Sequence, residues 1–102
     1  MRLASKDAGT RDAGLVEEVL GSTGRLKILR ALAASGFPSY TRYGLEKATG
    51  LKPMAVRGHL RVLVELGLVK EFDLTPVVYQ INCEKAFVAS LVEFFRKTGY
   101  TL

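Results

Sequence analysis

The stretch that decides the fold is residues 51–67, LKPMAVRGHLRVLVELG. Its large apolar side chains recur at helical spacing and give the stretch one side that faces a core; they are Leu51, Val56, Leu60, Leu63 and Leu66. Pro53 suits the first turn of a helix, and Gly67 suits its C-terminal cap. The sequence therefore predicts one amphipathic helix over about residues 52–66.

The side of this predicted helix that faces away from the core is basic and small-featured. It carries Lys52, Met54, Ala55, Arg57, Gly58 and Arg61, and no acid precedes Glu65. A helix that enters the major groove of DNA needs such a face, because phosphates and hydrogen-bonding base edges line the groove. We expect Arg57 at a base edge, since a guanidinium pairs bidentately with guanine, whereas Lys52 and Arg61 suit phosphates.

The 102-residue chain is long enough for one domain with a modest core and too short for two. Hydrophobic residues make up 48% of it and charged residues 25%, as in an ordinary soluble globular protein. No apolar run approaches the roughly 20 residues that span a bilayer, and the N-terminus lacks the apolar segment of a signal peptide. We therefore expect a cytoplasmic protein with no membrane partner.

Cysteine and histidine are too few for a metal centre. Cys83 and His59 each occur once, so neither a disulfide within the chain nor a thiolate cluster can form. We expect Cys83 to be a small buried hydrophobic residue. No acid–base pair, activated nucleophile or phosphate-binding loop stands at a productive spacing. The sequence therefore predicts no catalytic residues, no cofactor and no metal site.

The net charge of +5 is concentrated around the amphipathic helix, because residues 38–64 carry +4 and residues 65–102 carry −1. A basic patch on one supersecondary unit is typical of polyanion binding, although basic faces also occur on proteins that bind no polyanion. Residues 1–14 combine three basic residues with a single large apolar one. We expect them to form a flexible basic arm, or an inert tail, ahead of one domain at residues 15–102.

Three helices are expected before the amphipathic helix, over residues 15–20, over residues 25–35 and up to about residue 49. Suitable N-caps are Ser22 or Thr23 for the second and Ser39 or Thr41 for the third. Gly36 is expected to end the second helix, whose Arg25, Lys27 and Arg30 are most simply its solvent-exposed face. Gly50 permits a tight turn into the amphipathic helix. Two helices joined by so short a turn make a helix-turn-helix.

After Gly67 the pattern becomes strand-like. Residues 68–72 and 77–81 predict two strands that pair as a hairpin around residues 73–76. Asn82 is expected to cap a last helix, over about residues 84–98, that Gly99 ends.

The apolar surface of this last helix is wider than a core of this size needs, so it is either buried within the domain or faces a second copy. We favour a symmetric homodimer. Its expected contact residues are Leu15, Val19, Phe87, Leu91, Phe94 and Phe95.

The runs ILRALAASG (28–36) and TRYGLEKATGLKPMAVRGHLRVLVELGLV (41–69) resemble the DNA-binding domains of ArsR-like and MarR-like transcriptional regulators of prokaryotes and archaea. The resemblance covers about residues 19–82. It implies an α+β, mainly helical fold: a winged helix-turn-helix with a β-hairpin wing and a C-terminal dimerisation helix. It also implies double-stranded DNA as a partner. By position, the residues that face DNA would be Thr41, Arg42, Lys52, Met54, Ala55, Arg57, Gly58, His59 and Arg61.

Two features depart from this family. Its metal-sensing members carry cysteine or histidine ligands that this chain lacks, so metal sensing is not expected. The tip of the predicted wing, residues 73–76, contains one acid and no lysine or arginine, so we expect it to add little to DNA binding.

Two residues of the amphipathic helix over residues 52–66 each have two interpretations. His59 either reaches a phosphate or fills the edge of the core. Gly58 either lets the helix approach DNA closely or packs against a neighbouring helix.

The leading prediction is a sequence-specific, homodimeric DNA-binding transcriptional regulator. The alternatives are a winged-helix module that docks onto another protein, and a nonspecific, chromatin-like DNA binder. A small-molecule effector is conceivable in a pocket lined by Phe87, Tyr79 or Phe94, but aromatic residues at this spacing more simply form core.

Overall fold

The computed structural model describes residues 14–34 and 39–101. A helical segment over residues 14–20, here called the N-terminal segment, precedes the elements α2 (Thr23–Ala33), α3 (Arg42–Thr49), α4 (Pro53–Glu65), β1 (Val69–Phe72), β2 (Val78–Ile81) and α5 (Ala86–Thr98). Gly14 therefore belongs to a helix, and the rest of the expected basic arm lies outside the described residues.

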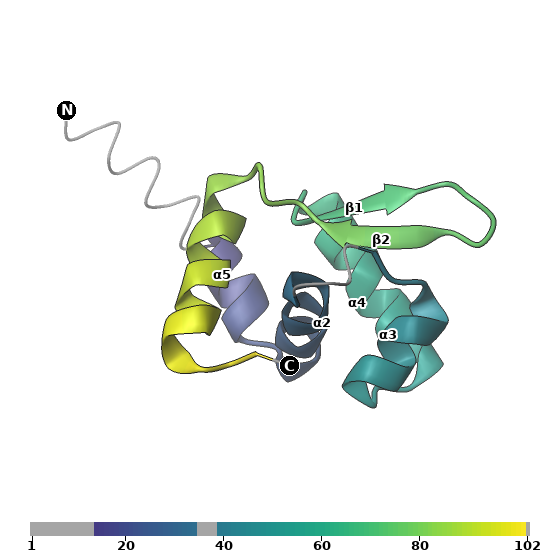
Figure 1. The fold of residues 1–102 in the computed structure, drawn as a ribbon, viewed down its shortest axis with the longest axis horizontal. Coiled ribbons are helices and arrows are strands. Elements are labelled where there is room, and N and C mark those ends of the chain that lie inside the picture. Colours follow the sequence, from purple (N-terminus) through teal and green to yellow (C-terminus); the bar gives the residue numbers. More distant parts are fainter. Residues whose placement is uncertain (1–13, 35–38, 102) are drawn as a thin grey trace.

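Helix α2 lies at the centre of the molecule (Figure 1). It contacts α3 and α4 on one side, α5 on the other, and strand β2. The two strands form an antiparallel hairpin whose β1 contacts α4. This arrangement is the predicted α+β, mainly helical fold, with a helix-turn-helix followed by a hairpin.

One apolar core joins all these elements. Helices α2, α4 and α5 each contribute a stripe at helical spacing; the buried residues are Ile28, Leu29, Ala31 and Leu32 from α2, Val56, Leu60 and Leu63 from α4, and Val88, Leu91 and Phe95 from α5. The core stripe predicted for α4 is thus confirmed, with Leu51 and Leu66 half-buried at its two ends.

Side-chain caps fix where α2 and α3 begin. The Oγ of Ser22 accepts a hydrogen bond from the Arg25 N–H at 3.2 Å, and the Oγ1 of Thr41 accepts one from the Gly44 N–H at 3.0 Å. Of the alternative caps, Ser22 and Thr41 are therefore the ones used. Helix α2 ends at Ala33 because Ala34 adopts an extended backbone, so Gly36, which lies outside the described residues, does not end it as expected.

Glycines with positive φ shape both ends of α4. Gly50 (φ 76°) makes the tight turn between α3 and α4, as predicted. At the other end, the Gly67 N–H donates to the Val64 carbonyl at 3.0 Å and the Leu68 N–H donates to the Leu63 carbonyl at 2.9 Å. These two bonds form a Schellman motif, with Gly67 (φ 78°) one residue beyond the cap.

The hairpin has the predicted position and pairs Val69 with Ile81 and Phe72 with Val78. Sequence reasoning missed a further pairing, because Tyr40 and Tyr79 exchange backbone hydrogen bonds of 3.0 and 2.8 Å. The segment before α3 is thereby fixed to the hairpin.

Two predictions for the β2–α5 connection are wrong. Asn82 does not cap α5, whose N-cap is Lys85 without a side-chain bond; instead, the Asn82 Nδ2 donates to the Gly67 carbonyl at 2.9 Å. Cys83 is exposed rather than buried, because it lies in this connecting turn outside the core. Gly99 does end α5, as expected.

Three of the expected dimer residues belong to the core of the single chain. Val19 is fully buried, and Leu91 and Phe95 are 6% and 2% exposed, because α5 turns this stripe towards α2 and the N-terminal segment. They are therefore wrong as contacts with a second copy. Leu15 and Phe87 are half-buried, and Phe94 is 52% exposed.

Candidate nucleic-acid interface

The outward side of α4 is the centre of the candidate interface. Most of the residues predicted to face DNA are exposed, namely Arg42, Lys52, Met54, Arg57, Gly58 and Arg61, with Met54 reaching 86%. Lys52 occupies the N-cap position of α4, and Arg42 is the first residue of α3. Thr41 and Ala55 are half-buried, and the Thr41 hydroxyl is engaged by the backbone of α3.

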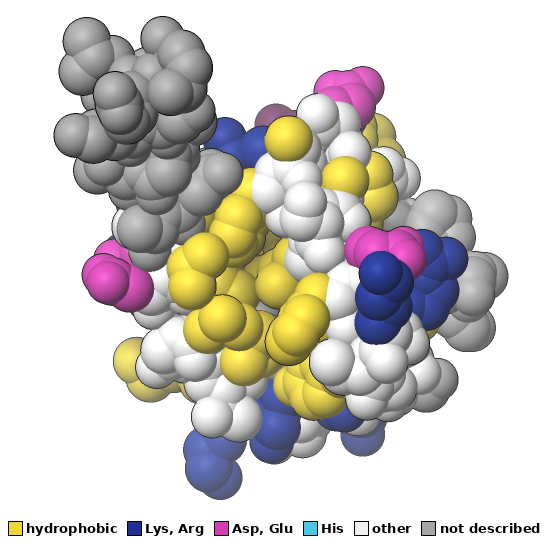
Figure 2. Space-filling model, turned by 90° about the vertical axis from the view of Figure 1, so that its left-hand side faces the viewer, with side chains coloured by type: hydrophobic (Ala, Val, Ile, Leu, Met, Phe, Trp, Pro, Cys, Tyr) yellow, Lys and Arg dark blue, Asp and Glu magenta, His cyan; other side chains and the backbone are white. Residues whose placement is uncertain are grey.

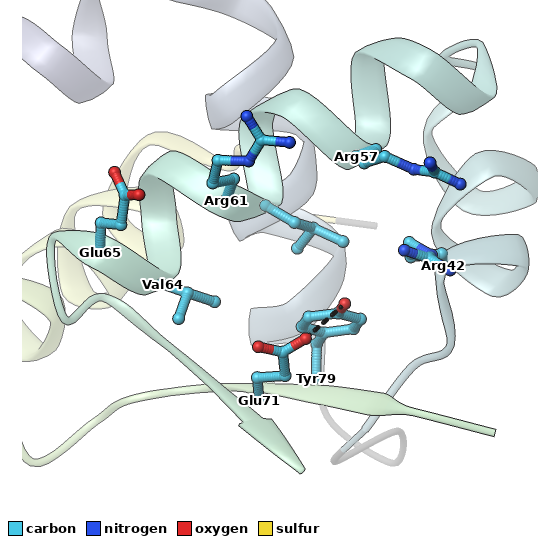
Figure 3. Close-up of a pocket in the computed structure, with 8 residues that line it drawn as sticks. Arg42, Arg57, Arg61, Val64, Glu65, Glu71 and Tyr79 are labelled. Carbon is cyan, nitrogen blue, oxygen red and sulfur yellow. Dashed lines mark hydrogen bonds between the residues drawn. The ribbon is translucent and has the colours of Figure 1, made fainter. Parts of the chain in front are cut away.

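Three arginines from two helices gather at one hollow (Figure 3). Arg42 of α3 and Arg57 and Arg61 of α4 line this space of about 400 Å³ between α4 and the hairpin. None of the three forms an ion pair with a carboxylate of the described residues. Their guanidinium groups are therefore free to meet an anionic partner from outside.

The hairpin adds an acidic group that sequence reasoning missed. The Tyr79 hydroxyl donates to the Glu71 Oε2 at 3.1 Å across the hairpin, and both side chains line the arginine hollow (Figure 3). Burial raises the pKa of Tyr79, and the bond to Glu71 raises it further. This hydrogen bond follows from the register of the hairpin, because Glu71 is paired directly with Tyr79 across the two strands.

The tip of the hairpin also faces the arginines. A second hollow, of about 630 Å³, is lined by Arg42 and Arg57 together with residues 74–77 of the tip. Leu74 there is 61% exposed. The hairpin therefore borders the basic side of the helix-turn-helix with a tip that carries no lysine or arginine.

The structure separates the two interpretations of Gly58 and of His59. A Cβ on Gly58 would meet nothing within 4 Å, so packing against a neighbouring helix does not explain this glycine. His59 is half-buried against α2, where a Cβ on Gly24 would come within 2.3 Å of the His59 Nε2. Burial, and then the charge of Arg25, lower the pKa of His59. This geometry favours a role for His59 at the edge of the core.

Within residues 14–34 and 39–101, no three His, Cys, Asp or Glu side chains converge where a metal ion would bind. In the same part of the chain, no helix is long and apolar enough to cross a membrane. Of the aromatic residues considered for an effector pocket, Tyr79 is 4% exposed and lines the arginine hollow, whereas Phe87 and Phe94 are not among the residues that line that hollow.

A helix-turn-helix with an exposed basic second helix, followed by a hairpin at its side, defines a winged helix-turn-helix protein. Residues 22–71 match the family described as "Bacterial regulatory protein, arsR family". The chain is therefore an ArsR-like winged helix-turn-helix regulator, as the sequence predicted.

Solved structures support the same fold. The transcriptional repressor BigR from Xylella fastidiosa superposes with a TM-score of 0.77 at 22% identity, covering 96% of this chain and 95% of that one. A predicted DNA-binding transcriptional regulator from E. coli gives a TM-score of 0.74 at 25% identity, covering 94% and 98%. The antimony-specific transcriptional repressor AntR gives 0.70 at 27% identity, covering 88% and 77%. Comparison with curated protein sequences gives no significant match.

Proposed function

We propose that the protein is a sequence-specific transcriptional regulator that binds double-stranded DNA as a homodimer, with α4 in the major groove. The observation that carries this proposal is a set of three arginines on the outward side of α3 and α4, Arg42, Arg57 and Arg61, that have no carboxylate partner among the described residues. The similar E. coli protein and AntR, described as a DNA-binding regulator and a repressor, support the same partner.

The roles of the side chains follow from their positions along α4. Residues at the start of a recognition helix meet base edges. Arg57 is one turn into α4 and suits a guanine, while Met54 and Ala55 lie in the first turn, where small or apolar groups suit thymine methyls. Lys52 and Arg61, at the start and towards the end of α4, suit phosphates on either side.

Backbone phosphates are the expected partners of the preceding helix. Arg42 is exposed at the start of α3, where positive charge and free N–H groups favour an anion. We assign Thr41, the N-cap of α3, to the same phosphate contact. The hairpin tip has no basic side chain to add, so we assign most of the binding energy to α3 and α4.

The face formed by α5 and the N-terminal segment is the proposed dimer contact. Figure 2 shows hydrophobic side chains gathered over this face. Val16 and Leu20 of the N-terminal segment and Phe94 of α5 are 38%, 47% and 52% exposed. Exposed apolar groups that cluster on one face are typical of a subunit interface, and a two-fold axis would present two α4 helices to half-sites about one turn of DNA apart.

The same apolar face is the observation that supports the docking alternative, because a different protein could cover it in place of a second copy. A stable homodimer that binds DNA supports the regulator, and a monomer without DNA affinity supports docking. Analytical ultracentrifugation of the pure protein distinguishes them. A regulator requires no catalytic group, and a cytoplasmic location remains a prediction of the proposal.

Fluorescence anisotropy tests the proposal directly. Binding of the purified protein is measured to its own promoter region and to random duplex DNA, at about 50 and about 200 mM salt. We expect tighter binding to the promoter and a steep loss of affinity with salt, because phosphate contacts release counterions. Equal affinity for both duplexes would indicate a nonspecific, chromatin-like binder. Absence of binding at both salt concentrations would contradict a DNA-binding function.

A further inference from the structure

A third hollow lies between the C-terminal ends of α2 and α5 and shares no residue with those beside α4. Its volume is about 310 Å³, and the chain turns back from the end of α5 towards α2 beside it (Figure 1). The residues that matter below are Arg30, Ala33, Val92, Phe95, Arg96 and Tyr100. This is not the effector pocket expected from sequence, since Phe87, Tyr79 and Phe94 are not among its lining residues.

Arg30 is the unmatched charge in this hollow. Its guanidinium lies 4.5 Å from the centre of the Tyr100 ring, and its Nε is shielded from solvent without a hydrogen-bond partner. No carboxylate of the described residues pairs with it, whereas Arg96 pairs with Glu93. Because the Nε is closed to solvent, an anion bound in the hollow would have to pair with the two terminal Nη groups of the Arg30 guanidinium.

The position of Arg30 in the fold explains only part of this arrangement. It stands in the last turn of α2, where the helix dipole favours a cation. That preference would be met equally well by a side chain extended into solvent, and the sequence led us to expect one. Instead the guanidinium is folded over an aromatic ring, which Phe95 holds in an edge-to-face contact at 5.1 Å.

The rest of the lining is mixed. Phe95 and Val92 of α5 and Ala33 of α2 contribute hydrocarbon, while Arg96, which pairs with Glu93, and Thr101 contribute polar groups. A bound molecule would therefore meet hydrocarbon beside the Arg30 cation. A volume near 300 Å³ is at the small end of ligand pockets in proteins. An inorganic anion would leave the apolar part of the lining uncovered, and a neutral apolar molecule would leave the Arg30 guanidinium without an anionic partner.

We propose that this hollow binds a small organic acid, with its carboxylate on Arg30 and its planar or branched apolar body against Phe95, Val92 and Ala33. A carboxylate matches the two-donor geometry of a guanidinium. Tyr100 holds the guanidinium from its other side by a cation–π contact. The proposal concerns binding alone and does not depend on DNA recognition.

Benzoate is the probe, because it combines one carboxylate with one flat apolar ring. Isothermal titration calorimetry of benzoate into the full chain should show saturable binding with a Kd on the order of 1 mM, as expected for a ligand of about nine heavy atoms. Benzamide has the same shape without the charge and should bind about tenfold or more weakly. Inorganic phosphate should bind no better than benzamide.

Arg30→Gln should weaken benzoate binding about tenfold or more. Lys97→Gln is the matched control, because it removes one positive charge from the same end of α5 at an exposed residue that does not line the hollow. It should leave the Kd unchanged. If circular dichroism shows that Arg30→Gln is unfolded, Val92→Phe serves instead, since a larger half-exposed side chain should fill the hollow and abolish binding.

Three results would overturn the proposal. These are no saturable binding of benzoate up to about 20 mM, equal binding of benzoate and benzamide, and unchanged binding by a folded Arg30→Gln or Val92→Phe protein. Because no DNA is present, such a failure is independent of the outcome of the promoter experiment.

Discussion

Arg57 and Lys52 are exposed on the same helix but have different proposed partners, so their loss should have different effects. Arg57→Ala should weaken promoter binding by about 1–3 kcal/mol and reduce the preference for the promoter over random DNA. Lys52→Ala should weaken binding to both duplexes alike and lower the salt slope by about one. Anisotropy titrations at several salt concentrations measure both effects.

Lys97→Ala is the control for these two variants, since it removes a positive charge from α5, away from the proposed interface. Lys97→Ala should change neither the preference for the promoter over random DNA nor the dependence of affinity on salt. If Arg57→Ala and Lys52→Ala both bind like the unaltered protein, the outward side of α4 is not the DNA-binding surface.

Gly58 provides a test in which stability and binding change in opposite directions. It lies in the interior of α4 with open space around its missing Cβ. Gly58→Ala should therefore raise the free energy of unfolding by about 1 kcal/mol, as alanine is the better helix former. The same methyl group should weaken DNA binding if α4 approaches the groove closely. Urea denaturation and anisotropy give the two values.

Gly24→Ala is the matched substitution in α2, and it should not show the same gain in stability. Its Cβ would come within 2.3 Å of the His59 ring, which would have to move. A Gly58→Ala protein that is more stable yet binds DNA normally would place residue 58 away from the groove.

His59 should make stability depend on pH. Burial and the charge of Arg25 lower its pKa in the folded protein, so the unfolded chain binds the proton more readily. Stability should therefore be lost as the pH falls below about 6.5, the ordinary histidine value in the unfolded chain. Urea midpoints at about pH 7.5 and about pH 5.5 measure the loss, and His59→Gln should reduce it. An equal loss in both proteins would contradict this assignment.

At the scale of elements, Asn82 connects the start of α5 to the end of α4. Its Nδ2 donates to the Gly67 carbonyl, so Asn82→Ala leaves that carbonyl without this partner. The free energy of unfolding should fall by about 1 kcal/mol. The neighbouring exposed Cys83→Ala should change it by less than about 0.5 kcal/mol. Urea denaturation of the two variants compares them, and equal values would show that the Asn82 bond adds nothing.

The elements that sequence predicted well are those determined locally. Ser22 and Thr41 cap helices through bonds to residues three positions away, and Gly50 and Gly67 adopt the backbone that a side chain disfavours. The exposed face of α4 follows from helical spacing for the same reason. These features need no knowledge of distant residues.

The features that sequence missed depend on residues far apart in the chain. The Tyr40–Tyr79 pairing joins positions separated by α3 and α4, and Asn82 is bonded to Gly67 rather than to its own helix. Likewise, which stripe of α5 faces α2 is decided by packing, so Leu91 and Phe95 were placed at a dimer contact although they are core residues. In the candidate site, Arg42, Arg57 and Arg61 were predicted, while Glu71 and Tyr79 required the hairpin register.

At the scale of the whole molecule, two adjacent phenylalanines of α5 allow dimerisation and folding to be tested separately. Phe94 is 52% exposed, whereas Phe95 is 2% exposed inside the chain's own core. A lysine at position 94 would place a charge in the proposed contact between copies and leave the core intact, so Phe94→Lys should give a folded monomer. Phe95→Lys should prevent folding, because it buries an unpaired charge.

Sedimentation velocity and circular dichroism together test this pair of variants, and DNA binding reports the consequence. A monomer contacts one half-site only, so the Phe94→Lys protein should lose most of its promoter affinity although its arginines are unchanged. If it remains a dimer, the contact lies elsewhere than on α5 and the N-terminal segment. If it is a folded monomer with full promoter affinity, a single winged helix-turn-helix is sufficient, and the proposed two-fold recognition is wrong.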